Sequence, residues 1–469
     1  MTSDLAQQFS QSSRALVVAP AGCGKTELIV DAVSCSRECR MLILTHTHAG
    51  VRALLDRLRR KGVPRNRYSV DTIAGWALRY ATAFPSLSGI QSEMPMGQDW
   101  QTVYGAASRA LSARTVRRVV RLSYGGVFVD EYQDCKQSQH NLILSIAELL
   151  PCRVVGDPLQ GIFNFGAEPE VDWVHKVEVA FEKIGELTFP WRWKRPGQNG
   201  VLGEWLLDAR RQLLAGSRLN LADAPIQWIE STPENTRKAC LSHNAKEMES
   251  IVAICRFPKD AYTLAKCLKG RLRCMEEVEC KDLLRFAKTI GETTGSGRSL
   301  AIIDFASTCM TRVSSELGSI RKCLLNGKVP TAAQHRKHPA IVNALLEASR
   351  TPELYPAAAA MKAIEALSGA VMFRRELYRE MQKTIASNLP NEKLENTAWR
   401  IRDAARRYGR RIEPRCVSRT LLVKGLEFDH AIVPKADELD TRNLYVALTR
   451  ASKSLTVLSK TPDLEARVK

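Results

Sequence analysis

Residues 19–26 read Ala-Pro-Ala-Gly-Cys-Gly-Lys-Thr and lie between an apolar run and a segment of helical character. A β-branched run, a glycine turn and a helix in this order are typical of a phosphate-binding loop. The two glycines allow a tight turn that points backbone N–H groups at an anion. Lys25 suits the β- and γ-phosphates of a nucleotide, and the Thr26 hydroxyl suits a magnesium ion. Ala19 stands where such loops usually open with glycine, so its φ must be negative.

A second apolar run, residues 126–129, ends in Asp130 and Glu131. Two carboxylates at the tip of a buried strand are costly without a cation. We therefore expect Asp130 to hold magnesium through water, and Glu131 to orient or deprotonate an attacking water. Gln160 follows the next strand-like run and is a candidate sensor of the γ-phosphate.

Other polar and aromatic residues follow strand-like runs. The carboxyl ends of parallel strands border the ligand crevice, so we expect Thr45, His46 and Thr72 to face a substrate. Phe163 and Phe165 are candidates for stacking on bases.

Two further groups leave alternatives open. Arg192 and Trp193 belong to a Trp-Arg-Trp sequence that could line the substrate or form only a surface cation–π contact. Gln7 and Gln8 are both candidates for reading an adenine, and a solvated helix start explains them equally well.

Composition indicates a polyanionic partner. The chain has 469 residues, with 69 Lys and Arg against 50 Asp and Glu, which gives a net charge of +19. With a nucleotide loop present, nucleic acid is the first candidate for that partner. The sequence begins without a charged-then-apolar leader and has no apolar run long enough to span a membrane. We expect a soluble, cytoplasmic protein of two to four domains that has no membrane partner.

Two regions have helical periodicity and lack strand patterns. Residues 259–411 are rich in alanine and arginine. Residues 76–124 combine aromatic residues with a basic stripe, which suits a single-strand groove, although core packing is the simpler role for each aromatic. The stripe consists of Arg109, Arg114, Arg117, Arg118 and Arg121.

Six segments, in this order, resemble the motifs of the UvrD/Rep-like superfamily 1 helicases. The resemblance implies an α/β fold of two RecA-like P-loop lobes with helical insertions, ATP between the lobes, single-stranded or tailed duplex DNA as partner, and 3′→5′ translocation. The first lobe would comprise residues 1–75 and 125–185, with 76–124 inserted. The second would comprise 186–258 and 412–469, with 259–411 inserted. The six segments are 19–26, 45–49, 130–134, 156–160, 424–428 and 445–450.

The resemblance also implies roles for individual residues. Phe163 and Phe165 would be the base-stacking pair, and Thr45, His46, Thr72 and Trp193 would lie on the DNA side. The ATP and Mg²⁺ site would contain Ala21, Gly22, Cys23, Gly24, Lys25, Thr26, Asp130, Glu131, Gln160, Arg192, Glu427 and Arg450, with Gln7 or Gln8 at the base.

Three positions on the expected DNA side depart from the family's pattern. His46 replaces an aromatic residue, Leu421 replaces a histidine, and no arginine follows Phe165. The main hypothesis is an ATP-driven DNA helicase, which would suit DNA repair. The alternative is a DNA-sensing ATPase that regulates a partner nuclease, docked on the helical insertion or the first lobe. Size and minimal architecture resemble the helicase subunit of Gabija-type systems, which would suit antiviral defence.

Overall fold

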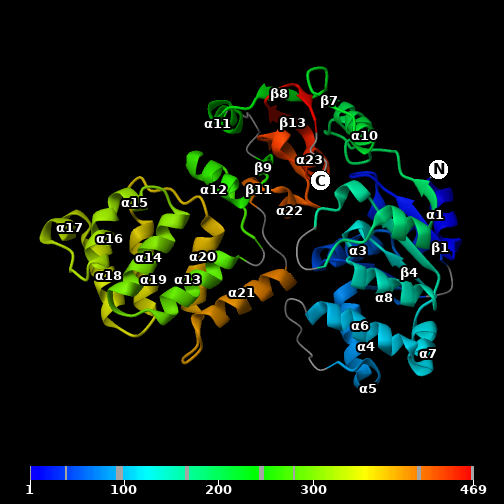
Figure 1. The fold of residues 1–469 in the computed structure, drawn as a ribbon, viewed down its shortest axis with the longest axis horizontal. Helices are drawn as coiled ribbons and strands as arrows, with labels where there is room; N and C mark the ends of the chain where they lie inside the picture. Colours follow the sequence, from blue (N-terminus) through cyan, green and yellow to red (C-terminus); the bar gives the residue numbers. More distant parts are fainter. Residues whose placement is uncertain are drawn as a thin grey trace. The chain divides into compact units, whose positions relative to one another are not determined.

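The computed structural model describes residues 2–36, 40–90, 99–163, 168–241, 248–277, 280–408 and 413–465. The chain forms two compact units (Figure 1). The first comprises Met1–Leu219 and Asp440–Lys453, and the second comprises Asn220–Leu439 and Ser454–Leu464. Each unit contains a sheet whose strands pair in parallel, covered by helices. The predicted α/β fold of two lobes with helical insertions is confirmed.

The first unit is built on a six-stranded sheet with the order β3-β2-β4-β5-β1-β6. All its pairings are parallel, so the carboxyl ends of the strands lie along one edge. β1 and β4 both have β5 as a neighbour, which brings the ends of these strands together. The strands are β1 (Arg14–Val18), β2 (Met41–Thr45), β3 (Tyr68–Thr72), β4 (Gly126–Val129), β5 (Cys152–Gly156) and β6 (Glu182–Glu186).

Helices bury both faces of this sheet. Alternate residues of β1 belong to different cores: Leu16 and Val18 pack on one side, and Ala15 and Val17 on the other. A strand that is apolar on both faces is typical of a parallel sheet covered on both sides. The helices are α1 (Thr2–Gln11), α2 (Lys25–Cys35), α3 (His48–Arg60), α4 (Ile73–Ala83), α5 (Pro85–Ser88), α6 (Asp99–Ser112), α7 (Arg114–Ser123), α8 (Gln137–Ala147), α9 (Glu178–Ala180), α10 (Gly200–Leu214) and α23 (Thr441–Leu448), with 3₁₀ turns Arg65–Arg67, Tyr132–Asp134 and Pro158–Gln160 and a π-helical turn Trp173–Val177.

The second unit contains a sheet with the order β10-β11-β9-β12-β13-β8. Parallel pairs join β10 with β11, β11 with β9, β9 with β12, and β13 with β8. The strands are β8 (Gln227–Glu230), β9 (Ile251–Cys255), β10 (Arg273–Cys274), β11 (Arg415–Arg419), β12 (Phe428–Val433) and β13 (Ala451–Ser459), and β7 (Leu219–Asn220) pairs with β14 (Asp463–Leu464) in a small separate sheet.

An all-helical part follows β10 in the chain and has its own apolar core. α13, α14, α18 and α20 each contribute buried side chains to it. The helices of the second unit are α11 (Pro233–Leu241), α12 (Pro258–Cys267), α13 (Lys281–Glu292), α14 (Gly295–Cys309), α15 (Val313–Glu316), α16 (Gly318–Leu325), α17 (Ala332–Lys337), α18 (Pro339–Arg350), α19 (Tyr355–Glu365), α20 (Arg375–Ala386), α21 (Leu394–Tyr408) and α22 (Thr420–Val423), with the 3₁₀ turn Ala436–Glu438.

The compact units divide the chain differently from the boundaries expected from the motifs. Residues 186–219 and Asp440–Lys453 belong to the unit that contains the first sheet. Arg192 and Arg450 therefore both lie in that unit. None of the helices in the described ranges has the length and apolar character needed to cross a bilayer.

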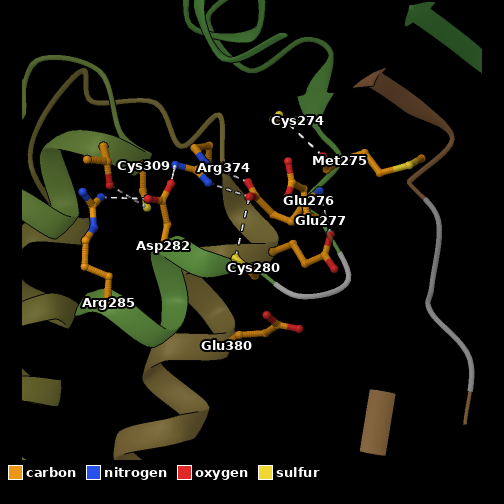
Figure 2. A network of polar contacts seen from close by, with 12 residues as sticks. Cys274, Met275, Glu276, Glu277, Cys280, Asp282, Arg285, Cys309, Arg374 and Glu380 are labelled. Carbon is orange, nitrogen blue, oxygen red and sulfur yellow. Dashed lines mark hydrogen bonds and ion pairs between the residues drawn. The ribbon is translucent and has the colours of Figure 1, made fainter. Parts of the chain in front are cut away.

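A buried ion-pair network joins the sheet of the second unit to its helical part (Figure 2). The Arg374 guanidinium, just before α20, donates to both carboxylate oxygens of Glu276, at 2.8 and 2.6 Å. It also lies 2.8 Å from Asp282 in the first turn of α13. Arg374 is 3% exposed and Glu276 is fully buried, so the carboxylate depends on this partner. Losing one member of such a pair leaves a buried charge uncompensated.

Arg374→Ala should therefore lower the opening free energy of α13 and α20 by about 3–5 kcal/mol. The matched control is Arg379→Ala, because Arg379 forms an exposed pair with Glu365 and surface pairs contribute about 0–1 kcal/mol. Native-state hydrogen exchange of the two helices measures both variants. Equal effects of the two substitutions would contradict an anchoring role for Arg374.

Candidate nucleotide-binding site

The glycine-rich segment forms a tight loop between β1 and α2. Gly22 and Gly24 have φ angles of 71° and 95°, in the left-handed region that favours glycine. Ala19 is not among the residues with positive φ, as the prediction required. Gly24 is the N-cap of α2 and has no side chain with which to bond the amides of the first turn. An anion is the usual partner of such amides.

The start of α2 directs the lysine of the motif back over this loop. Lys25 is the first residue of α2 and is 9% exposed. Its Nζ donates to the Ala19 carbonyl at 3.1 Å and lies 3.6 Å from a carboxylate oxygen of Glu131. The ammonium group is thus held between the loop and the end of β4. Thr26 follows it and is half-buried.

Two tryptophans and an arginine pack against the same loop. The Arg192 amide donates to the Gly22 carbonyl at 3.1 Å. A Cβ built on Gly22 would lie 2.5 Å from the Trp193 ring, and one built on Gly24 would lie 3.3 Å from Trp191. Gly22 is therefore required by space as well as by backbone conformation, and Gly24 is required by its backbone conformation. Trp193 is buried, whereas Trp191 is 49% exposed.

α23 holds the loop from another direction. The Ala21 amide donates to the Tyr445 hydroxyl at 3.1 Å. The Arg192 guanidinium donates to the Thr449 carbonyl at 2.7 Å, and the Trp193 indole donates to the Ala451 carbonyl at the same distance. Burial raises the pKa of the Tyr445 hydroxyl well above its usual value, so this group stays neutral.

The acidic pair lies at the end of β4, between the ends of its neighbours β2 and β5. The Asp130 amide donates to the Leu44 carbonyl at 2.8 Å, which fixes the pair at this edge of the sheet. Burial, and then the charge of Glu131, raises the pKa of Asp130 to about 7. Glu131 has a φ of 55°, a strained value for a residue other than glycine. Its carboxylate accepts a hydrogen bond from the Gln133 amide at 2.5 Å.

A buried polar cluster lies beside the acidic pair at the end of β5. The Gln133 side-chain oxygen accepts from the Asp157 amide at 2.9 Å, so one glutamine links both segments. Asp157 is fully buried and forms a 3.0 Å ion pair with Arg210 of α10. The Gln160 amide donates to Asp157 at 2.9 Å. Gln160 is therefore held by an internal carboxylate, close to the residues that contact the loop.

Residues expected to contact DNA have varied surroundings. Thr45 is buried, and Thr72 caps α4 by accepting from the Gly75 amide at 2.9 Å. His46 Nε2 lies 3.6 Å from the Cys135 sulfur. Phe163 is half-buried, and its carbonyl accepts from the Lys136 ammonium at 2.6 Å. Phe165 lies outside the described residues.

The remaining candidates are distributed over both units. Arg450 is buried and donates to the Val446 carbonyl and the Thr449 hydroxyl, each at 2.8 Å. Burial raises the pKa of Cys23 to about 12, so this loop thiol stays protonated. Gln7 and Gln8 are exposed on α1, and Glu427 is exposed in the second unit.

Sequence reasoning assigned no role to several residues that hold the site together. Tyr445 and Gln133 lie inside two of the motifs. A hydroxyl among apolar neighbours was the available signal for Tyr445, and the sequence around Gln133 gave none. Arg210 lies in α10 outside any motif, so its pairing with Asp157 could not be found from spacing. Trp191 is the exposed member of the Trp-Arg-Trp sequence.

The site fits a nucleotide phosphate and its magnesium ion. The start of α2, which a glycine caps, and the Lys25 ammonium group suit the phosphates. Asp130 is a buried carboxylate whose ionisation a nearby cation would favour. No group of three or more His, Cys, Asp or Glu residues is arranged to hold a metal by itself within the described ranges. Magnesium held here would therefore require the phosphates as ligands, as is usual for this ion.

Residues 3–166 match a family model described as an AAA domain. A comparison with curated proteins gives no match. Among solved structures, the chain is similar to an arterivirus nonstructural protein 10 helicase in complex with DNA, at 11% identity and a TM-score of 0.37, covering 97% of this chain and 63% of that one. It is also similar to the Pif1 helicase from Candida albicans, at 12% identity and a TM-score of 0.33, with coverages of 58% and 54%. A third similar structure is a Pif1 helicase from Bacteroides in complex with ADP-AlF3 and ssDNA. It has 11% identity and a TM-score of 0.28, and the match covers 56% of this chain and 55% of that one. The chain spans less than two thirds of each.

Replacing Gly22 should disrupt the loop for two reasons, which are backbone strain at a positive φ and a clash with the Trp193 ring. Gly22→Ala forces a Cβ into the Trp193 ring and places alanine at a positive φ, whereas Gly62→Ala meets the same φ requirement with no atom within 4 Å. We expect Gly62→Ala to cost about 1–2 kcal/mol of stability without changing ATP affinity. Gly22→Ala should lower that affinity by at least about tenfold. Titration with a fluorescent ATP analogue measures both, and equal affinities would contradict the assignment.

Proposed function

We propose that this chain is an ATP-hydrolysing DNA helicase or translocase. The observation that carries the proposal is the distance of 3.6 Å between Lys25 Nζ and Glu131 at the carboxyl edge of a parallel sheet. A cation for phosphates and a carboxylate for water meet there, beside the start of α2, which a glycine caps. That combination is the one needed for phosphoryl transfer to water. The match of residues 3–166 to an AAA domain supports the nucleotide assignment.

In this proposal each residue acts on a different part of the nucleotide. The loop amides and Lys25 bind the β- and γ-phosphates. Thr26 and Asp130 hold Mg²⁺, which would supply positive charge to neutralise the phosphates. Glu131 accepts a proton from, or orients, the attacking water. The strained backbone at Glu131 and its hydrogen bond from Gln133 hold the carboxylate in one position, which favours this role.

Arginine residues would complete the charge stabilisation. Arg192 lies against the loop through its own amide, and its guanidinium is 2.7 Å from the Thr449 carbonyl. Arg450 follows Thr449 directly. A change in the position of α23 would therefore move both guanidinium groups, and this offers a route by which DNA binding could control hydrolysis. Gln160, held by Asp157, would report on the γ-phosphate through the same cluster.

The nucleic-acid part of the proposal is supported by charge and by the ordered motifs. A net charge of +19 attracts a polyanion, and six helicase-like segments occur in order. The finer proposal is a UvrD/Rep-like enzyme that moves 3′→5′ on single-stranded DNA, with Phe163 and Phe165 as base-stacking residues.

Removing either charged group of the site should abolish turnover. Lys25→Ala and Glu131→Gln should each lower ATP hydrolysis by on the order of a hundredfold or more. Glu131→Gln should still bind ATP and magnesium, because it changes water positioning rather than phosphate contacts. Lys183→Ala and Glu148→Gln are controls of matched residue type on the surface of the first unit, and both should retain full activity. Normal hydrolysis by Glu131→Gln would rule out the carboxylate assignment.

The direction in which the protein moves along DNA tests the UvrD/Rep-like assignment. Strand displacement should occur on duplexes with a 3′ tail and fail on 5′-tailed and blunt duplexes. Unwinding from a 5′ tail would contradict the UvrD/Rep-like assignment and leave an ATP-driven helicase.

DNA-stimulated hydrolysis without unwinding would instead support a DNA-sensing ATPase that regulates a partner nuclease. A contact between His46 and Cys135 favours this second candidate. His46 was expected on the DNA side, and its imidazole contacts the Cys135 sulfur within the protein. Co-purification of a nuclease with the protein from its native cell would test that partner directly.

A further inference from the structure

The arginines of α7 form an exposed basic face that the proposed ATP site does not use. Arg114, Arg118 and Arg121 are exposed and Arg117 is half-buried. At about 100° per residue these four lie on one side of the helix, away from Val116 and Val120, which are buried in the core of the first unit. The fifth arginine of the predicted stripe, Arg109, is different. Its guanidinium donates to the Ser88 carbonyl at 3.0 Å and so contributes to local packing.

The α7 arginines have no acidic neighbour in sequence. The segment from Trp100 to Val129 contains no Asp or Glu. Within the described ranges, none of the four guanidinium groups forms an ion pair or hydrogen bond with another residue. Several other exposed arginines of the first unit carry a carboxylate partner. Such pairs are Arg59–Asp56, Arg79–Asp71, Arg211–Asp208 and Arg218–Glu465.

Four guanidinium groups on one helix face repel each other, and no carboxylate within the described residues offsets this repulsion. Their retained charge suits an anion outside the chain. Guanidinium is the group best shaped to bind phosphate through paired N–H donors. From Arg114 to Arg121 the helix rises about 10 Å, which spans about three phosphates of one DNA strand along the axis.

The aromatic residues of this region do not support base stacking. Trp76, Tyr80 and Tyr104 are all buried in the core of the first unit. These three aromatic rings therefore do not line the single-strand groove that the sequence predicted. The arginine face of α7 offers charge and no aromatic ring, which suits the sugar–phosphate backbone rather than the bases.

α7 also lies away from the phosphate loop within the first unit. Its last residue, Ser123, comes shortly before the start of β4 at Gly126, whereas the acidic pair follows the end of that strand. The carboxyl end of α7 is therefore near the amino edge of the sheet, and the loop is at the carboxyl edge (Figure 1). A ligand on α7 would occupy a second site, separate from the strand ends.

We propose that the arginine face of α7, made by Arg114, Arg117, Arg118 and Arg121, binds the phosphodiester backbone of nucleic acid. The proposal rests on the proposed function, which makes nucleic acid the partner of this chain. It adds a site that grips the backbone independently of sequence and of nucleotide state. A membrane surface is the competing ligand. It is less suited because Val116 and Val120 of α7 are buried in the core, and the exposed Val119 and Leu122 are little apolar surface to insert into lipid.

The test compares two triple variants with the same change in charge. Arg114→Gln, Arg118→Gln and Arg121→Gln are combined in one protein. The control combines Arg59→Gln, Arg211→Gln and Arg218→Gln, which are exposed and each paired with a surface carboxylate. Fluorescence anisotropy gives the affinities for a single strand and for a blunt duplex, from about 0.05 to 0.2 M salt. ATP hydrolysis without DNA reports whether each variant is folded and should equal that of the unmodified protein.

The α7 variant should reduce the slope of log affinity against log salt by about 2–3, because each lost phosphate contact removes about 0.7–0.9. Its affinity at about 0.1 M salt should fall by at least about tenfold. If the salt slope falls with only one of the two DNAs, that DNA is the ligand. If it falls with both the single strand and the duplex, the ligand is the phosphodiester backbone that they share. A slope equal to that of the control variant would overturn the proposal.

Two further outcomes separate the alternatives. Loss of binding to phosphatidylserine vesicles by the α7 variant, with an unchanged DNA slope, would also overturn the proposal and favour a membrane. Absence of salt-dependent DNA binding by the unmodified protein would instead contradict the proposed function itself. The failure of the α7 site is thus distinguishable from the failure of the helicase assignment.

Discussion

The contact between the glycine loop and the residues that cover it is the constraint on which the site depends. Gly22 has room for no side chain because the Trp193 ring lies against it, and its carbonyl accepts from the Arg192 amide. Tyr445 meets the Ala21 amide on the same loop. These contacts hold the backbone in a left-handed conformation that exposes amides, and they require the segments after β6 and around α23 to remain packed on β1.

The same packing connects phosphate binding to the rest of the first unit. Glu131 and Asp157 lie at the ends of adjacent strands and are joined through Gln133. Asp157 is neutralised by Arg210, and this pair ties α10 to the sheet edge. A displacement of α10 or α23 would therefore change the hydrogen bonds of the acidic site. Such a shared polar cluster gives a physical basis for coupling between nucleotide state and conformation.

The strands and the phosphate loop were predictable from local sequence, because β-branched runs, glycines and the Asp130–Glu131 pair each have a local physical meaning. The two α/β lobes were implied by the resemblance of six ordered segments to superfamily 1 helicase motifs. The partners of buried polar groups were not predictable, since Arg210 and Arg374 meet their carboxylates through tertiary packing. The α7 stripe shows a similar limit: the sequence grouped Arg109 with the other arginines, and only its contact with Ser88 separates it from them.

We propose that one site of this protein hydrolyses ATP and that nucleic acid controls the rate of hydrolysis. Steady-state ATP hydrolysis by the unmodified protein, measured with and without single-stranded DNA, tests it most directly. We expect magnesium-dependent hydrolysis that rises several-fold when DNA is added and returns to the basal rate when salt releases the DNA. Absence of hydrolysis under both conditions, or a rate that DNA leaves unchanged, would contradict it.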